Sequence, residues 1–160
     1  MPRTCATTRF GNVTINEDNI IRFPHGIPGF EENKDWYILG EQEHPIKWLQ
    51  NLEDGSIALP IMAPHAVCTE YDAKVPDSEL ETIRPENVDD LVLVCVVAIP
   101  PDAPWDMTVN LRAPVVINKR LNLGCQVIAL NEDYGVRHLV FPEETRRQLS
   151  EEAARIRAEA

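Results

Sequence analysis

Short apolar segments, separated by proline, glycine and acidic turn residues, recur along most of the chain. The clearest is Leu91–Ile99, a continuous and largely β-branched run that predicts a strand buried on both faces. No helix long enough for a parallel crossover separates these segments, so the pattern predicts a mainly β barrel or sandwich. The other predicted strands are residues 7–10, 13–15, 20–23, 36–39, 46–49, 57–62, 108–111, 115–118, 124–130 and 136–141, with a weaker one at 66–72.

Proline and glycine positions refine this picture. The segment Phe23–Phe30 (FPHGIPGF) contains two prolines and two glycines. We therefore expect a rigid loop whose Ile27 and Phe30 reach the core. Gly11-Asn12 predicts a two-residue hairpin turn. Pro60 lacks a backbone N–H, which predicts that the strand around it bends or lies at a sheet edge.

Helical patterns are few. We expect a short helix at 76–83, one helical turn at 85–90, and a helix after Pro142. The apolar stripe of the last helix is narrow, which favours a partly frayed terminal helix over a docking or oligomerising one. The predicted organisation is a β domain at 1–141 and a helical tail at 142–160. The stripe consists of Leu149, Ala153 and Ile156.

The chain is acidic, with a formal net charge of −11. From Glu31 to Asp90 there are 15 acidic and 4 basic residues, so this segment carries the whole net charge. Such a surface repels phosphate backbones and anionic membranes and favours basic protein partners. The N-terminus has no apolar signal core, and the four cysteines form no close pair, so we expect a cytoplasmic protein.

The sequence contains no recognisable catalytic or cofactor motif. No serine lies in a Gly-x-Ser-x-Gly setting, and His65 and Cys68 make half a zinc pattern without a second half. We therefore expect a protein without enzymatic activity, cofactor or metal. Side chains suited to protein binding remain, although core packing explains a tryptophan and turn formation explains an asparagine equally well. These candidates are Trp48, Leu49, Gln50, Asn51, Asn110 and Arg112.

Taken in order, several segments resemble the FliW family of flagellar assembly factors. The resemblance extends from about Phe10 to Phe141 and leaves the tail after Pro142 outside it. It adds Tyr71 to the candidate binding residues. The matching segments are FPHGIPGFE (23–31), WLQNLED (48–54), Tyr71, NLRAPVVIN (110–118) and GCQVIALNEDYGVRH (124–138).

The resemblance implies a small, antiparallel β-barrel-like protein that binds flagellin in the cytoplasm. It also implies binding to CsrA, a small RNA-binding translational repressor, so that secretion of flagellin frees the factor to sequester CsrA. Part of the acidic segment Glu31–Asp90 would then steer CsrA, which must be basic to hold RNA. An apolar groove near Trp48 and Leu49 would receive a flagellin helix.

Two other functions are alternatives. A small-ligand-binding barrel or a hydrolase-like enzyme would need a deep polar pocket near His25, His65 or His138. A filled barrel interior would argue against it. Direct nucleic-acid binding is disfavoured by the charge and would need a basic face, formed by Arg112, Lys119 and Arg120.

Overall fold

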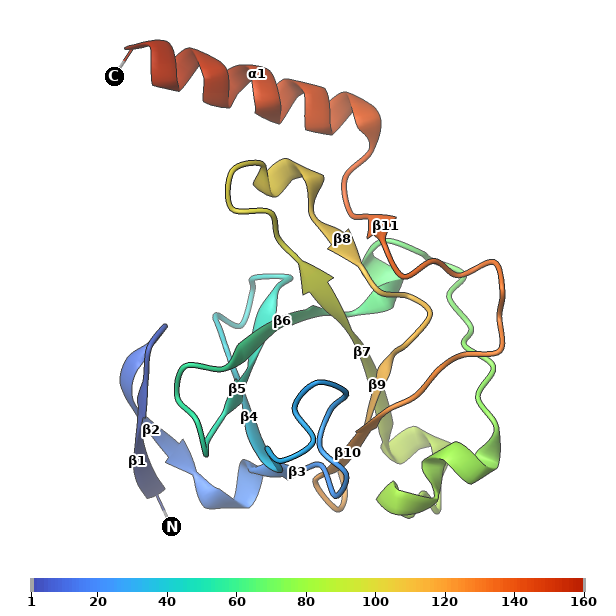
Figure 1. The fold of residues 1–160 in the computed structure, drawn as a ribbon. Helices are drawn as coiled ribbons and strands as arrows, with labels where there is room; N and C mark the ends of the chain where they lie inside the picture. The colour runs from blue at the N-terminus through green and yellow to red at the C-terminus, as the bar shows by residue number, and fades with distance from the viewer. Residues whose placement is uncertain (1, 160) are drawn as a thin grey trace.

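A seven-stranded barrel forms the centre of the computed structural model, which describes residues 2–159 (Figure 1). The ring closes because β9 pairs with β7 as well as with β10. The predicted mainly β, barrel-like fold is confirmed. One pairing departs from the antiparallel order, since β10 runs parallel to β3. Around the ring the strands are β7 (Leu91–Ala98), β6 (Ala58–Met62), β5 (Lys47–Asn51), β4 (Asp35–Leu39), β3 (Ile21–Arg22), β10 (Leu123–Gln126) and β9 (Val115–Asn118).

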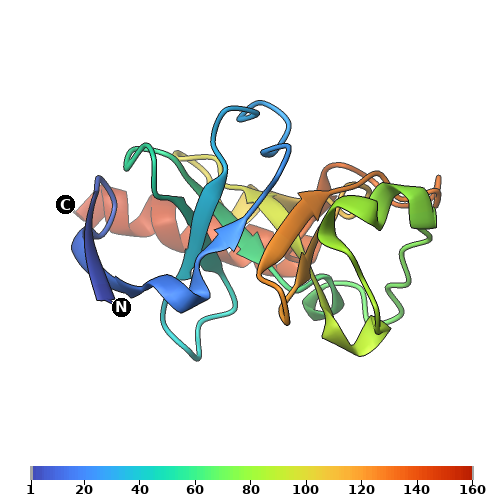
Figure 2. The same ribbon diagram turned by 90° about the horizontal axis from the view of Figure 1, so that it is seen from below.

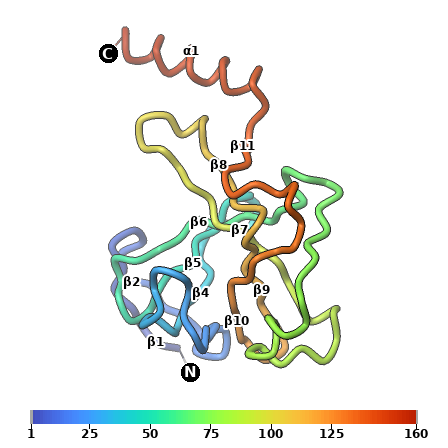
Figure 3. The backbone as a smooth tube through the Cα atoms, turned by 45° about the vertical axis from the view of Figure 1, so that its right-hand side comes forward, coloured from blue at the N-terminus to red at the C-terminus, as the bar shows by residue number. Residues whose placement is uncertain are grey.

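The other elements surround this barrel. Strands β1 (Pro2–Thr7) and β2 (Gly11–Asn16) form a hairpin, while β8 (Thr108–Val109) and β11 (His138–Leu139) extend the sheet beyond β7. The hairpin and the segment of residues 77–90 lie on opposite sides of the barrel (Figures 1, 2 and 3). The helices are the 3₁₀ helices η1 (Glu17–Asn19), η2 (Pro64–Ala66), η3 (Asp77–Ile83), η4 (Val88–Asp90) and η5 (Pro104–Asp106), and α1 (Glu143–Glu159).

Apolar side chains from the strands fill the barrel. Phe23, Trp36 and Leu49 are completely buried, and Ile61 is 1% exposed. Gly124 is needed beside Phe23, because a Cβ at position 124 would lie 2.6 Å from the Phe23 ring. Trp36 also donates its indole N–H to the Asn33 carbonyl at 3.0 Å, so its polar group is satisfied inside the core.

The proline- and glycine-rich loop between β3 and β4 lies across the opening of the ring (Figure 1). As predicted, Ile27 is buried and Phe30 packs against the same core. Gly26 has φ +67°, and a Cβ there would lie 2.5 Å from the Phe30 carbonyl oxygen. The tight turn therefore requires glycine, which explains how so short a loop brings two apolar side chains back to the barrel.

Several strand predictions are corrected by the structure. Residues 66–72 form no strand but follow η2 as a loop, because their apolar side chains pack between elements rather than along a sheet. Strand β7 is not buried on both faces, since Val92 is 39% exposed at one end. Of the two alternatives for the strand around Pro60, the structure excludes the edge, since β6 pairs with both β5 and β7, although its pairing with β7 begins only after Pro60.

The hairpin turn also differs from the prediction. Thr7 pairs with Gly11, so the chain turns at residues 8–10, where the sequence predicts a strand, and Gly11-Asn12 begin the second strand. The first strand is instead Pro2–Thr7. Thr7 stabilises this turn because its hydroxyl accepts a hydrogen bond from the Phe10 N–H at 2.8 Å. The predicted helical segments are confirmed as η3, η4 and α1. The strands predicted at 108–111, 124–130 and 136–141 are shorter than expected.

Candidate protein-binding surfaces

Trp48 lies on the outer face of β5, at a pocket of about 380 Å³. Its neighbour Leu49 points into the barrel core, so the alternation of the strand directs Trp48 outward. The hairpin tip covers part of the indole, with the Phe10 ring centroid at 6.4 Å and the Arg9 guanidinium carbon 3.7 Å from the ring centroid. The pocket is lined by Phe10, Leu39, Gly40, Glu41, His44, Ile46 and Trp48.

The three residues after Trp48 have structural roles. Leu49, Gln50 and Asn51 are all completely buried, so their side chains do not face a partner. The Gln50 amide donates to the carbonyls of Gly55 and Ile57, both at 3.1 Å, and thereby holds the turn after β5. These contacts position the surface around Trp48 but add no contact atoms to it.

Asn51 and Asn110 form the same kind of turn at the ends of different strands. The Asn51 Oδ1 accepts from the N–H groups of Glu53 and Asp54. The Asn110 Oδ1 accepts from those of Arg112 and Ala113 at 3.1 and 3.0 Å. This is the asparagine turn in which the side chain replaces a backbone acceptor. Both asparagines therefore have a clear structural role.

Asn110 is half-buried and also lines a second pocket, of about 350 Å³, beside the loop that closes the barrel opening. Arg112 points elsewhere, because its Nε donates to the Ala129 carbonyl at 3.1 Å. The second pocket shares no lining residue with the Trp48 pocket. It is lined by Ile27, Pro28, Phe30, Leu59, Val96, Ala98, Thr108, Asn110, Gln126, Val136 and Arg137.

Tyr71 fixes a loop to the barrel. It is 5% exposed, its hydroxyl donates to the Leu111 carbonyl at 2.8 Å, and its ring stacks on Tyr134 at 4.8 Å. Burial raises the pKa of the Tyr71 phenol well above its usual value. Burial also raises the pKa of the neighbouring Cys95 thiol to about 11, so this thiol stays protonated and acts as a core residue.

The structure does not gather the predicted binding residues into one site. Trp48 and Asn110 line separate pockets, while Tyr71 and Arg112 hold loops in place. Sequence reasoning missed Phe10, Leu39 and Ile46 around Trp48. Strand pairing brings Leu39 and the hairpin brings Phe10 from distant positions, whereas Ile46 is only two residues before Trp48. It also missed the exposed apolar residues that follow β10 and precede β11, namely Ile128, Leu130 and Val136.

The acidic segment Glu31–Asp90 divides into separate regions. Glu41 lies at the Trp48 pocket, whereas the acids of η3 and η4 lie on the opposite side of the barrel (Figure 2). Arg120 pairs with Asp90 of η4 at 3.4 Å and with Glu86, which lies between the two helices, at 3.1 Å. The exposed acids left on η3 are Asp77, Glu79 and Glu81.

The geometry does not favour the small-ligand alternative. Apolar side chains fill the barrel interior, and His25, His65 and His138 are exposed residues that do not converge on a pocket. Within residues 2–159, no group of three or more His, Cys, Asp or Glu side chains is placed to hold a metal ion. In the same part of the chain, no helix has the length and apolar character needed to cross a membrane.

Comparisons of the sequence and of the structure with known proteins all find the same family. A family model described as FliW protein matches residues 4–140. The flagellar assembly factor FliW of Thermotoga maritima is 42% identical over 137 residues, which cover 85% of this chain and 92% of that protein. The FliW of Caldicellulosiruptor saccharolyticus is 36% identical over 132 residues, covering 82% and 86%. A crystal structure of the flagellar assembly factor FliW matches with a TM-score of 0.80 at 33% identity, covering 89% of this chain and 99% of that one.

Proposed function

Because the chain belongs to the FliW family of flagellar assembly factors, we propose that it binds flagellin and CsrA in the cytoplasm. By sequestering CsrA it relieves the repression of flagellin translation, and by holding flagellin it acts as a chaperone-like binder without catalysis. The observation that carries this proposal is the family match over residues 4–140, which contain the whole barrel. The division into a domain at 1–141 and a tail at 142–160 is part of the same proposal.

We assign flagellin to the Trp48 pocket. This pocket combines a half-buried tryptophan with aliphatic walls, the composition that receives the apolar face of a helix. Replacing Trp48 by alanine should weaken the affinity for flagellin of the same organism by at least about tenfold, as for a central interface tryptophan. Titration calorimetry measures this. Ile128→Ala, at an apolar residue that is 67% exposed and outside this pocket, is the control and should change the affinity little.

If the wild-type protein binds neither flagellin nor CsrA in the calorimeter, the proposed function as a whole is contradicted. Binding of flagellin that is insensitive to Trp48→Ala would contradict the assignment of the pocket alone. Adding CsrA to the flagellin complex, and the reverse, then distinguishes one shared surface from two separate ones.

CsrA should associate faster as the ionic strength falls, because exposed acids on η3 attract a basic partner over distances that salt screens. The double variant Glu79→Lys/Glu81→Lys should reduce the association rate and its salt dependence in stopped-flow measurements. Glu132→Lys/Asp133→Lys changes the net charge equally at exposed residues outside the acidic segment. Equal effects of the two double variants, or a rate indifferent to salt, would refute steering by η3.

A further inference from the structure

Helix α1 lies outside the part of the chain that matches the family, which ends at residue 140. It lies across the η5 loop, away from the barrel opening (Figures 1 and 3). Two arginines connect it to that loop: Arg146 Nε to the Asp106 carboxylate at 3.1 Å, and Arg157 Nη2 to the Asp102 carbonyl at 3.4 Å. Eleven residues are close to three helical turns, so both arginines lie on one flank of α1.

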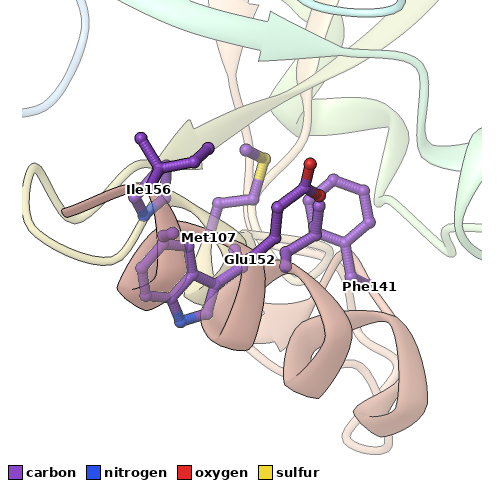
Figure 4. A pocket seen from close by; sticks show the side chains of 8 residues that line it. Met107, Phe141, Glu152 and Ile156 are labelled. Atoms are coloured by element: carbon purple, nitrogen blue, oxygen red, sulfur yellow. The ribbon is translucent and has the colours of Figure 1, made fainter. Parts of the chain in front are cut away.

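An apolar groove of about 280 Å³ runs between α1 and the η5 loop (Figure 4). None of residues 143–159 is buried, and Ile156, which lines the groove, is 61% exposed. The packing of α1 against the domain is therefore incomplete, and apolar side chains on both sides remain open to a further surface. The groove, named here the α1 groove, is lined by Pro104, Trp105, Met107, Phe141, Leu149, Glu152, Ala153 and Ile156.

The two flanks of α1 carry opposite charge. The basic flank, Arg146 and Arg157, already binds the η5 loop. The other flank carries Glu152, which lines the groove, and Glu159 seven residues later. Within residues 2–159, the ion pairs of α1 involve neither of these glutamates. The open side of the α1 groove is therefore apolar with an acidic border.

We propose that the α1 groove is a docking site for an amphipathic helix of a partner protein whose polar border is basic. Apolar residues at i, i+3 or i+4, and i+7 would contact Leu149, Ala153 and Ile156, because these span two turns of α1. Lysine or arginine beside them would meet Glu152 and Glu159. A second copy of the chain fits less well: a two-fold antiparallel pairing of α1 would place the acidic flanks side by side.

Binding of a synthetic helix to the full chain tests this. The probe is a fluorescent helical peptide of about 18 residues, roughly 27 Å long, with leucines in the spacing above and lysines along one flank. Fluorescence polarisation should show saturable binding, and a peptide with glutamates in place of the lysines should bind at least about tenfold more weakly. Equal binding of both peptides would contradict the acidic border.

A pair of variants with the same net charge separates groove binding from general attraction to an acidic protein. Ile156→Asp places a carboxylate in the α1 groove and should weaken the affinity for the basic peptide by at least about tenfold. Ala154→Asp places it on the opposite, exposed face of the same helix and should change the affinity by less than about twofold. Circular dichroism of both variants checks that α1 remains helical.

A second pair tests the border itself. Glu152→Lys should weaken binding of the lysine peptide, whereas Glu151→Lys, at an exposed residue that pairs with Arg147 and does not line the groove, should not. Equal effects within either pair would overturn the proposal. So would a dimer of the free chain in sedimentation that Ile156→Asp dissociates, because a second copy would then occupy the groove. Loss of flagellin or CsrA binding has no bearing on these results, so the two proposals fail separately.

Discussion

Replacing Trp36 by alanine is expected to lower the free energy of unfolding by about 3–5 kcal/mol. Trp36 is completely buried, and its ring makes edge-on contacts with Phe23 and Phe30 at centroid distances of 6.2 and 6.1 Å. The loop across the barrel opening rests on the same ring through Phe30. The substitution therefore leaves a cavity at the point where the loop and the strands meet. The free energy of unfolding of a domain of this size is about 5–15 kcal/mol in total, so the expected loss is a large fraction of it.

Urea denaturation followed by circular dichroism measures this loss without relying on the fluorescence of the residue removed. Trp48→Ala is the matched control, because Trp48 lies half-buried at the surface pocket and its truncation leaves no closed cavity. We expect a clearly smaller loss of stability for Trp48→Ala. Equal losses would show that the barrel core is not centred on Trp36.

Gly55→Ala is expected to destabilise the protein by about 1–3 kcal/mol and to loosen the β1–β2 hairpin. A Cβ at position 55 would lie 2.1 Å from the Ala6 carbonyl oxygen. Because that atom belongs to the backbone, the whole hairpin must move away. The movement would break the 3.0 Å hydrogen bond from the Thr8 N–H to the Gly55 carbonyl. It would also withdraw Phe10 from Trp48.

Hydrogen exchange followed by mass spectrometry distinguishes this local effect from general destabilisation. Peptides covering residues 2–16 should exchange faster in Gly55→Ala, and flagellin affinity should fall because the Trp48 pocket loses one wall. Gly135→Ala is the control, since the nearest atom to a Cβ there is 3.9 Å away. Its stability should stay within about 0.5 kcal/mol of wild type. An unchanged hydrogen-exchange rate in residues 2–16 would show that the contact with Gly55 does not stabilise the β1–β2 hairpin.

Local patterns in the sequence predict much of the fold. The β-branched runs at 91–99 and 115–118 become β7 and β9, and the two prolines and two glycines of 23–30 make the expected loop. In contrast, segment 66–72 has apolar residues that suit a strand, yet Tyr71 binds the Leu111 carbonyl 40 residues away. Such a long-range contact has no local signal, and it outweighs the local preference for a strand.

The candidate sites were harder to predict than the fold. The segment from Trp48 to Asn51 does not alternate clearly between apolar and polar residues. The sequence alone therefore does not show which of these side chains point outward. The structure leaves Trp48 half-buried at a surface pocket and completely buries the next three side chains. Its pocket also depends on Phe10, which the hairpin brings across the sheet. When several distant segments form a surface together, no single segment carries a sequence pattern that predicts it.

The parallel pairing of β3 with β10 has a consequence for how the chain folds. Leu123 pairs with Arg22, and β9 must pair with β7 before the ring is complete. During synthesis, β3 to β7 can form hairpins early, but the β7 edge of that sheet stays open until β8 and β9 have emerged, and the β3 edge until β10 has emerged. Contacts over such sequence distances slow folding, and unpaired edges invite aggregation. This flagellar assembly factor thus passes through an aggregation-prone stage during its own folding.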